Sequence, residues 1–374
     1  MTEFCSPETD DYSYTCFSND SLIKIAKSYN NDMNHDIINI PSIAQLNDSD
    51  IRRKLWESIK NAMLSVSCEK DYCLLNHNSI KKLKDHKINY ETFRPVMPDT
   101  WNENMNTWLS TIDIMNVMKQ YEKKHKDFLF IGPVPIDFNY KITFGMCISN
   151  ELCNFSLEKF INSGKKKLGV IFNLDPHFMG GSHWVALFSD IYTGGVYFFD
   201  SYGVKPRVEI QKFMEKIKKQ GNDLILRNKI KITDIDDEHK NQYEFEKLDE
   251  YTIKVSSTKD IYVNDLIHFS QSKDQDAPSY SINTVKYVTK EKIGFYKKID
   301  CLDCKYIVHK CFKIFYNSTK FQYENSECGV YSMHFIEEFL NGKKYKEIIN
   351  NPIHDTVINE KRRFYYRPNK NQTY

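Results

Sequence analysis

The 374-residue sequence predicts a mixed α+β fold, and three observations lead to this expectation. Apolar residues recur at helical spacing in the first ninety residues, the pattern changes to that of buried strands from Lys167 onward, and a strongly apolar helix returns at Cys328–Leu340. The composition, 41% hydrophobic and 14% aromatic, supplies enough apolar surface for one large domain or two smaller ones.

Residues 1–90 are expected to form a helical accessory region. Apolar side chains recur at helical spacing within residues 22–26 and 51–63, and loops rich in Asn and Asp separate these stretches. A further helix is predicted to begin after Ser110, a residue type that caps helix N-termini, and to end at about His125.

Residues 91–345 are expected to form the main domain. Three strands are predicted, at 168–172, 183–188 and 196–199, with a turn at 193–195 between the last two. A helix over 207–220 follows, with Gly221 as its expected end. The charged, patchily strand-like stretch at about 226–305 is interpreted as an insertion, and a strand is predicted at 314–321.

The end of the chain is expected to be a basic C-terminal tail over 346–374. It follows the apolar helix Cys328–Leu340, which Gly342 is expected to end, and it carries Lys361, Arg362 and Arg363. Such a tail is predicted to be solvated, and contact with a nucleic-acid cofactor is the alternative.

Charge and hydropathy exclude two classes of partner. Lys and Arg number 52 against 50 Asp and Glu, so the net charge of +2 is too small for non-specific binding to nucleic acid or to an anionic membrane. No apolar run approaches the roughly 18 residues of a membrane span, and the N-terminus lacks the pattern of a signal peptide. The protein is therefore expected to stay in its compartment of synthesis.

The ten cysteines are scattered along the chain and predict reduced thiols. Cys301, Cys304, His309 and Cys311 lie close together, but their spacing does not match that of paired zinc ligands. We therefore expect no metal and no other cofactor.

A His–Asp pair is predicted at one edge of the sheet. His183 begins the second strand, and Asp200 directly follows the third, 17 positions later. In an antiparallel hairpin the start of one strand lies beside the end of the next, so the carboxylate should reach the imidazole. A buried carboxylate that holds the tautomer of a histidine is what a general base requires.

Cys328 is the candidate nucleophile. It begins an apolar helix after a polar loop, where backbone N–H groups and the helix dipole favour a thiolate. Gln322 lies six positions upstream, and its amide, together with the backbone N–H of Cys328, is expected to hold a developing oxyanion.

The order His183, Asp200, Gln322, Cys328, with His183-Trp184, Asp200-Ser201 and Cys328-Gly329-Val330-Tyr331 around them, resembles the ubiquitin-like-protein-specific cysteine protease family. That family includes SUMO proteases and adenovirus-type endopeptidases. The resemblance implies a papain-like core, in which a central mixed sheet packs against the helix that carries the catalytic cysteine.

The resemblance also implies roles for two tryptophans. Trp184 and Trp108, the latter in a segment similar to the family's Trp-Leu-Asn-Asp, would form a narrow tunnel that admits Gly-Gly before the scissile bond. The alternative is that both are core aromatics. The helical N-terminal region and residues 131–137 resemble the large-DNA-virus branch, in which such enzymes mature virion proteins.

The expected function is therefore that of a viral thiol protease, a hydrolase that cleaves after Gly-Gly-type sites in structural-protein precursors during virion maturation. Its location would be the virus factory in the host cytoplasm, with packaging in the virion. Its partner would be a protein substrate, either a polyprotein precursor or a ubiquitin-like conjugate. Three alternatives remain: a SUMO or ubiquitin-like deconjugating protease, a clan-related acetyltransferase, and an inactive binding module.

Overall fold

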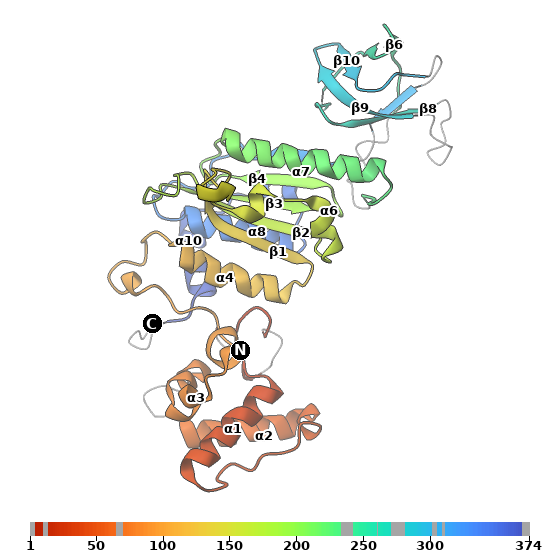
Figure 1. The fold of residues 1–374 in the computed structure, drawn as a ribbon. Helices are drawn as coiled ribbons and strands as arrows, with labels where there is room; N and C mark the ends of the chain where they lie inside the picture. Colours follow the sequence, from red (N-terminus) through yellow and green to blue (C-terminus); the bar gives the residue numbers. More distant parts are fainter. Residues whose placement is uncertain are drawn as a thin grey trace. The chain divides into compact units, whose positions relative to one another are not determined.

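A computed structural model describes residues 4–9, 14–64, 70–232, 242–259, 261–270, 281–300, 305–308 and 311–368 (Figure 1). The chain divides into two compact units. Unit 1 comprises Met1–Lys126, Glu324–Tyr331 and Ile353–Tyr374, and unit 2 comprises Asp127–Tyr323 and Ser332–Pro352. Unit 1 therefore extends beyond the expected boundary at residue 90 and includes the end of the chain.

Unit 1 is helical, as its apolar spacing predicts. Its main helices are α1 (Asn19–Met33), α2 (Ser49–Met63), α3 (Asn78–Leu83) and α4 (Thr111–Lys124), and its short helical turns are Gln45–Asn47, Asp71–Asn76, Lys87–Glu91 and Asp99–Asn102. Leu22, Ile25, Trp56 and Ile59 lie in its core. Ser110 caps α4 and forms a reciprocal capping box with Asp113.

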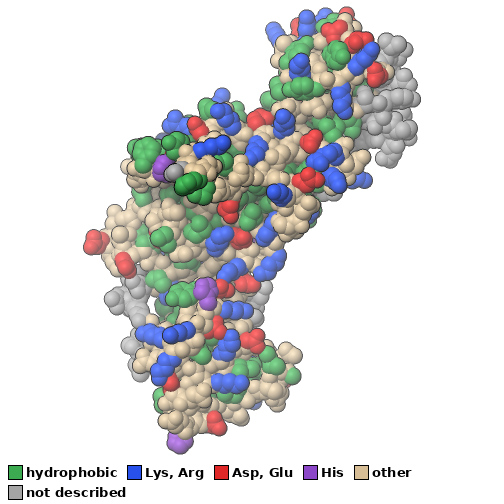
Figure 2. Space-filling model, viewed as in Figure 1, with side chains coloured by type: hydrophobic (Ala, Val, Ile, Leu, Met, Phe, Trp, Pro, Cys, Tyr) green, Lys and Arg blue, Asp and Glu red, His purple; other side chains and the backbone are tan. Residues whose placement is uncertain are grey.

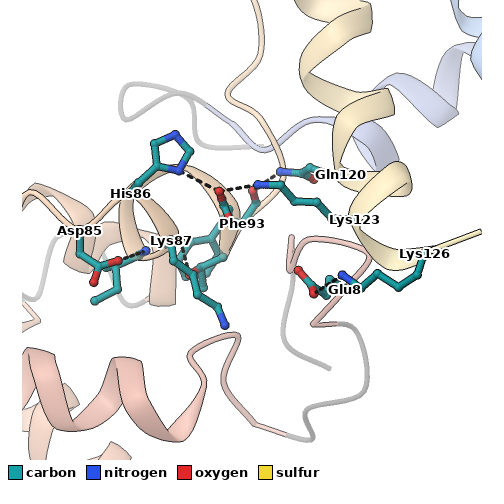
Figure 3. Close-up of polar contacts among 11 residues, drawn as sticks. Glu8, Asp85, His86, Lys87, Phe93, Gln120, Lys123 and Lys126 are labelled. Atoms are coloured by element: carbon teal, nitrogen blue, oxygen red, sulfur yellow. Dashed lines mark hydrogen bonds and ion pairs between the residues drawn. The ribbon is translucent and has the colours of Figure 1, made fainter. Parts of the chain in front are cut away.

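Side-chain contacts of α4 explain why unit 1 extends past residue 90 (Figure 3). Gln120 Nε2 donates a hydrogen bond of 2.8 Å to the carbonyl oxygen of Phe93, and Lys123 forms an ion pair with Glu91. Gln120 is buried, so its amide fixes α4 to the segment that follows the N-terminal helices.

The C-terminal segment differs from the expected solvated tail. It forms α9 (Tyr345–Asn350) in unit 2 and α10 (Asp355–Tyr365) in unit 1. Ile358, Arg362 and Tyr365 recur at helical spacing on the buried side of α10. Arg362 is therefore an interior residue with 0% exposure, whereas Arg363 beside it is exposed.

Unit 2 contains a five-stranded mixed sheet, which confirms the predicted fold class. Its strands are β1 (Phe128–Pro135), β2 (Lys167–Asn173), β3 (Trp184–Asp190), β4 (Gly195–Phe199) and β12 (Lys313–Tyr316). They lie in the order β1-β2-β3-β4-β12, with β1 parallel to β2, β12 parallel to β4, and antiparallel pairs between. The strands predicted at 168–172, 183–188 and 196–199 correspond to β2, β3 and β4.

Helices cover both faces of this sheet (Figure 1). On one face, α7 (Val208–Leu226) and α6 (Leu157–Asn162) pack against Leu187 and Phe198, and Leu152 of the short helix α5 (Asn150–Cys153) belongs to the same core. A short helical turn at Thr143–Gly145 precedes α5 in the chain. On the other face lies α8 (Cys328–Leu340), where Phe339 stacks on Phe188 at 4.5 Å and Phe335 on Phe199 at 4.8 Å between ring centroids. Successive side chains of β3 and β4 point to opposite faces of the sheet, so each strand contributes apolar side chains to both faces.

The prediction that Gly221 ends its helix was wrong, because α7 continues to Leu226. A Cβ atom at Gly221 would lie 2.3 Å from the ring of Phe312. Glycine at this position therefore allows the close approach of an aromatic side chain rather than a turn.

The stretch expected as an insertion forms a second sheet, of seven strands. These are β5 (Gln242–Tyr243), β6 (Glu246–Lys247), β7 (Thr252–Lys254), β8 (Leu266–Ser270), β9 (Ser281–Val288), β10 (Lys292–Phe295) and β11 (Lys305–Val308). The insertion has its own core, including Ile253, Ile293 and Phe295. Lys218 of α7 binds Asp265 at 2.7 Å, and both side chains are almost fully buried.

Disulfides between described residues contradict the expectation of reduced cysteines. Cys5 pairs with Cys16, and Cys147 pairs with Cys153, because short loops bring their Cα atoms to 5.2 and 6.3 Å. Within the described part of the chain, Cys311 and Cys328 are the free thiols. Cys301, Cys304 and His309 lie outside the described residues.

Two surface properties bear on the expected partners. Lys and Arg side chains are interspersed with Asp and Glu on the face shown in Figure 2. In the parts of the chain that the structure describes, every helix is too short or too polar to cross a membrane.

Candidate active site

The structure brings His183 and Asp200 together at the edge of the sheet. His183 directly precedes β3 and Asp200 directly follows β4, and these strands pair in antiparallel register. His183 Nε2 lies 2.8 Å from Asp200 Oδ1, and the two side chains are 11% and 3% exposed. The hairpin geometry is the one that the spacing predicts, and burial strengthens the contact because little water competes for it.

Asn317 holds Asp200 in place, and the sequence analysis missed it. Asn317 Oδ1 accepts a hydrogen bond of 2.9 Å from the backbone N–H of Asp200, and Asn317 Nδ2 donates to the carbonyl oxygen of Asp200 at 2.7 Å. The two residues are 117 positions apart. Only the pairing of β4 with β12 brings them together, so no local pattern signals the contact.

Tyr202 was also missed. Its ring stacks on the imidazole of His183, with 4.7 Å between centroids and 25° between planes. The backbone N–H of Tyr202 donates to Asp200 Oδ1 at 2.8 Å. The available signal in the sequence was that Tyr202 lies two residues after the predicted carboxylate of Asp200. A turn at this point directs the following side chains back toward the end of the strand.

A pocket of about 280 Å³ adjoins this pair. Its walls include His183, Asp200, Ser182, Tyr202, Lys205 and Arg207. The imidazole thus lies at a concave surface, which is the setting expected for a group that acts on a bound substrate.

Gln322 lies close to the same hairpin end. The strand predicted at 314–321 ends at Tyr316, so Gln322 follows in a loop, fully buried. Its Oε1 accepts a 2.7 Å hydrogen bond from Ser201 Oγ, and its backbone N–H donates to the carbonyl oxygen of Ser201 at 2.9 Å. The residue after Asp200 therefore fixes both the backbone and the side chain of Gln322.

Cys328 is the first residue of α8 and is 2% exposed. Glu327 before it is buried, and its carboxylate accepts hydrogen bonds from the backbone N–H of Ser326 at 2.8 Å and from Ser326 Oγ at 2.5 Å. Cys328 belongs to unit 1, whereas His183, Asp200 and Gln322 belong to unit 2. The pairing of its thiol with the imidazole remains a prediction.

The two candidate tunnel tryptophans differ in exposure. Trp184 begins β3 and is 5% exposed, while Trp108, two residues before the cap of α4, is 46% exposed. An aromatic side chain in the core would be almost fully buried, so the exposure of Trp108 disfavours the alternative that it is a core residue. The buried Trp184 is compatible with either role.

Comparisons with known proteins point to one group of enzymes. "Putative thiol protease R355" of Acanthamoeba polyphaga mimivirus is 27% identical over 378 residues, covering 97% of this chain and 93% of that protein. The crystal structure of the ASFV pS273R protease aligns with 99% of this chain and 97% of its own, with a TM-score of 0.53 and 15% identity. The chain is thus similar to a viral thiol protease, and it is a cysteine protease.

This finding confirms the predicted enzyme class, and the likeness to pS273R confirms the fold class over nearly the whole chain. The SUMO protease Ulp1 is a more distant match, with 12% identity, 69% of this chain and 75% of that chain covered, and a TM-score of 0.35. No protein-family model matches the chain.

Proposed function

We propose that this cysteine protease is an endopeptidase that cleaves after Gly-Gly-type sites in precursors of viral structural proteins during virion maturation. It would act in the virus factory of the host cytoplasm and be packaged in the virion. The observation that carries the proposal is the buried His183–Asp200 contact at the edge of a pocket, since it orients an imidazole for proton transfer.

The proposed mechanism starts from the contact between His183 and Asp200. Asp200 Oδ1 accepts from His183 Nε2, so the neutral imidazole carries its proton there and Nδ1 is the nitrogen that receives a proton. Nδ1 takes the proton of Cys328 Sγ, and the thiolate attacks the scissile carbonyl. The imidazolium then protonates the leaving amine, and a thioester forms as the C–N bond breaks. Water, deprotonated by His183, hydrolyses the thioester and restores the thiol.

Gln322 and the backbone N–H of Cys328 are proposed to hold the oxyanion. Ser201 Oγ donates a hydrogen bond to Gln322 Oε1, so we assign the role of oxyanion donor to Nε2 of the same amide. We expect Gln322→Ala to lower kcat by about 10²–10³-fold with little change in KM, because the oxyanion forms only in the transition state. Steady-state kinetics on a Gly-Gly-Xaa peptide measure this effect.

Ser201→Ala provides the matched control for that measurement. It leaves Gln322 in place but removes the hydroxyl that orients its amide, so we expect a smaller loss of kcat in the same direction. A Gln322→Ala variant with wild-type kcat would exclude the oxyanion role.

Selection for glycine is proposed to depend on Trp184 and Trp108. If the two indoles line the channel that holds the substrate residues before the scissile bond, a Cβ atom on either of those residues contacts packed aromatic side chains, at a cost of about 1–3 kcal/mol. We expect a Gly-Gly peptide to be cut faster than its Gly-Ala or Ala-Gly counterpart, and Trp184→Ala to narrow that advantage. The values of kcat/KM for the three peptides, with both proteins, are the measurement.

If folded Trp184→Ala keeps the wild-type ratio of kcat/KM between the Gly-Gly peptide and the alanine-containing peptides, the indole of Trp184 has only a packing role in the core. Fluorogenic SUMO and ubiquitin substrates, assayed beside the peptides, test the deconjugating alternative. A proteomic survey of cleavage termini, with Cys328→Ala protein as the reference, would identify the precursor.

A further inference from the structure

Arg362 has no part in the mechanism above, yet it is the most completely buried basic residue in the described part of unit 1, at 0% exposure. A buried guanidinium is unfavourable unless its donors are satisfied. Arg362 Nη1 donates to the carbonyl oxygen of Thr107 at 2.7 Å, Nη2 to that of Ser326 at 2.6 Å, and Nε to Asn359 Oδ1 at 3.0 Å.

The two carbonyl groups belong to segments that the proposed function uses. Thr107 directly precedes Trp108, and Ser326 lies two residues before Cys328. Arg362 is 255 positions from Thr107 and 36 from Ser326. Because the guanidinium is planar and rigid, its two terminal nitrogens fix the separation of the two backbone segments.

The charge of Arg362 is compensated locally. Burial lowers the pKa of Arg362, while Glu327, Tyr366 and Cys328 act in the opposite direction. Asn359 links the two buried charges, since its Oδ1 accepts from Arg362 and its Nδ2 donates to Glu327 Oε1 at 3.1 Å. The guanidinium also lies over the ring of Trp101, 5.1 Å from its centroid.

We propose that Arg362 is a positioning residue that holds the loop before Cys328 and the segment before Trp108 in one fixed arrangement, so that it governs both turnover and selection for glycine. This inference rests on the proposed function. Glu327 and Asn359 support it by fixing the orientation of the guanidinium.

The test compares Arg362→Lys with Arg363→Gln. Lysine keeps the charge but replaces the planar fork with a single ammonium group, whereas Arg363→Gln removes a charge at the neighbouring exposed position. We expect Arg362→Lys to keep a cooperative melting transition, to lower kcat by about 10²-fold with a smaller change in KM, and to reduce the Gly-Gly over Gly-Ala ratio. Arg363→Gln should match wild type in all three measurements.

Folded Arg362→Lys with wild-type kcat and an unchanged peptide ratio overturns the inference. If Arg362→Lys does not fold, Asn359→Ala takes its place, because it removes the acceptor of Nε and leaves the guanidinium present. For Asn359→Ala we expect a smaller loss of kcat than for Arg362→Lys, and the same reduction of the Gly-Gly over Gly-Ala ratio. A wild-type ratio in Asn359→Ala overturns the inference. Activity in Cys328→Ala would instead overturn the proposed function, so the two failures are distinguishable.

Discussion

Replacing Cys328 with alanine is expected to abolish peptide hydrolysis, with a loss of kcat of at least about 10⁴-fold, because it removes the sulfur that is proposed to form the thioester. The melting temperature should stay close to that of wild type, since only one sulfur atom is removed from the start of α8. Hydrolysis of a Gly-Gly-Xaa peptide and a thermal melt are the two measurements.

Cys311→Ala is the matched control for Cys328→Ala. Both thiols are free and buried, but burial raises the pKa of the Cys311 thiol to about 12. At about pH 7.5 its thiolate fraction is then on the order of 10⁻⁴ to 10⁻⁵, so Cys311 should be inert. Full activity in Cys328→Ala, or loss of activity in a folded Cys311→Ala, would reject Cys328 as the nucleophile.

His183→Ala should lower kcat by roughly 10³–10⁴-fold and should also slow the alkylation of Cys328 by iodoacetamide near neutral pH. The second effect follows if the imidazole accepts the thiol proton in the resting enzyme. Alkylation is followed by mass spectrometry of the Cys328 peptide, with the Cys311 peptide as the internal reference for an unreactive thiol.

His177→Ala is the control for the histidine substitution. His177 Nδ1 lies 2.6 Å from Asp137 Oδ2, so the chain contains a second His–Asp pair, but the imidazole of His177 is 37% exposed. We expect its loss to leave both hydrolysis and alkylation close to wild type. Equal effects of the two substitutions would mean that neither histidine is the general base.

The sequence predicted those parts of the site that depend on neighbouring elements. The contact of His183 with Asp200 follows from the period of two strands and the turn between them. The start of α8 at Cys328 follows from an apolar helical run after a polar loop. Both predictions use only local spacing, and the structure has both features.

The residues that were missed depend on distant pairings. Asn317 contacts Asp200 only because β12 lies beside β4, and Arg362 contacts Thr107 only because the end of the chain folds back into unit 1. A run of basic residues is typical of a solvated surface, so the pattern at 361–363 gave no sign that one of the three is buried. The need for glycine at position 221 likewise comes from its contact with Phe312, which follows the insertion in the sequence.

The parallel pairing of β4 with β12 also determines when the active site can form. His183 and Asp200 are synthesised before the insertion, whereas Asn317, Gln322 and Cys328 follow it. Loop closure over such a distance is slow, and domains generally fold as units during synthesis. The nascent chain therefore carries its proposed base long before its proposed nucleophile, and we expect proteolytic competence to arise only in a late folding step.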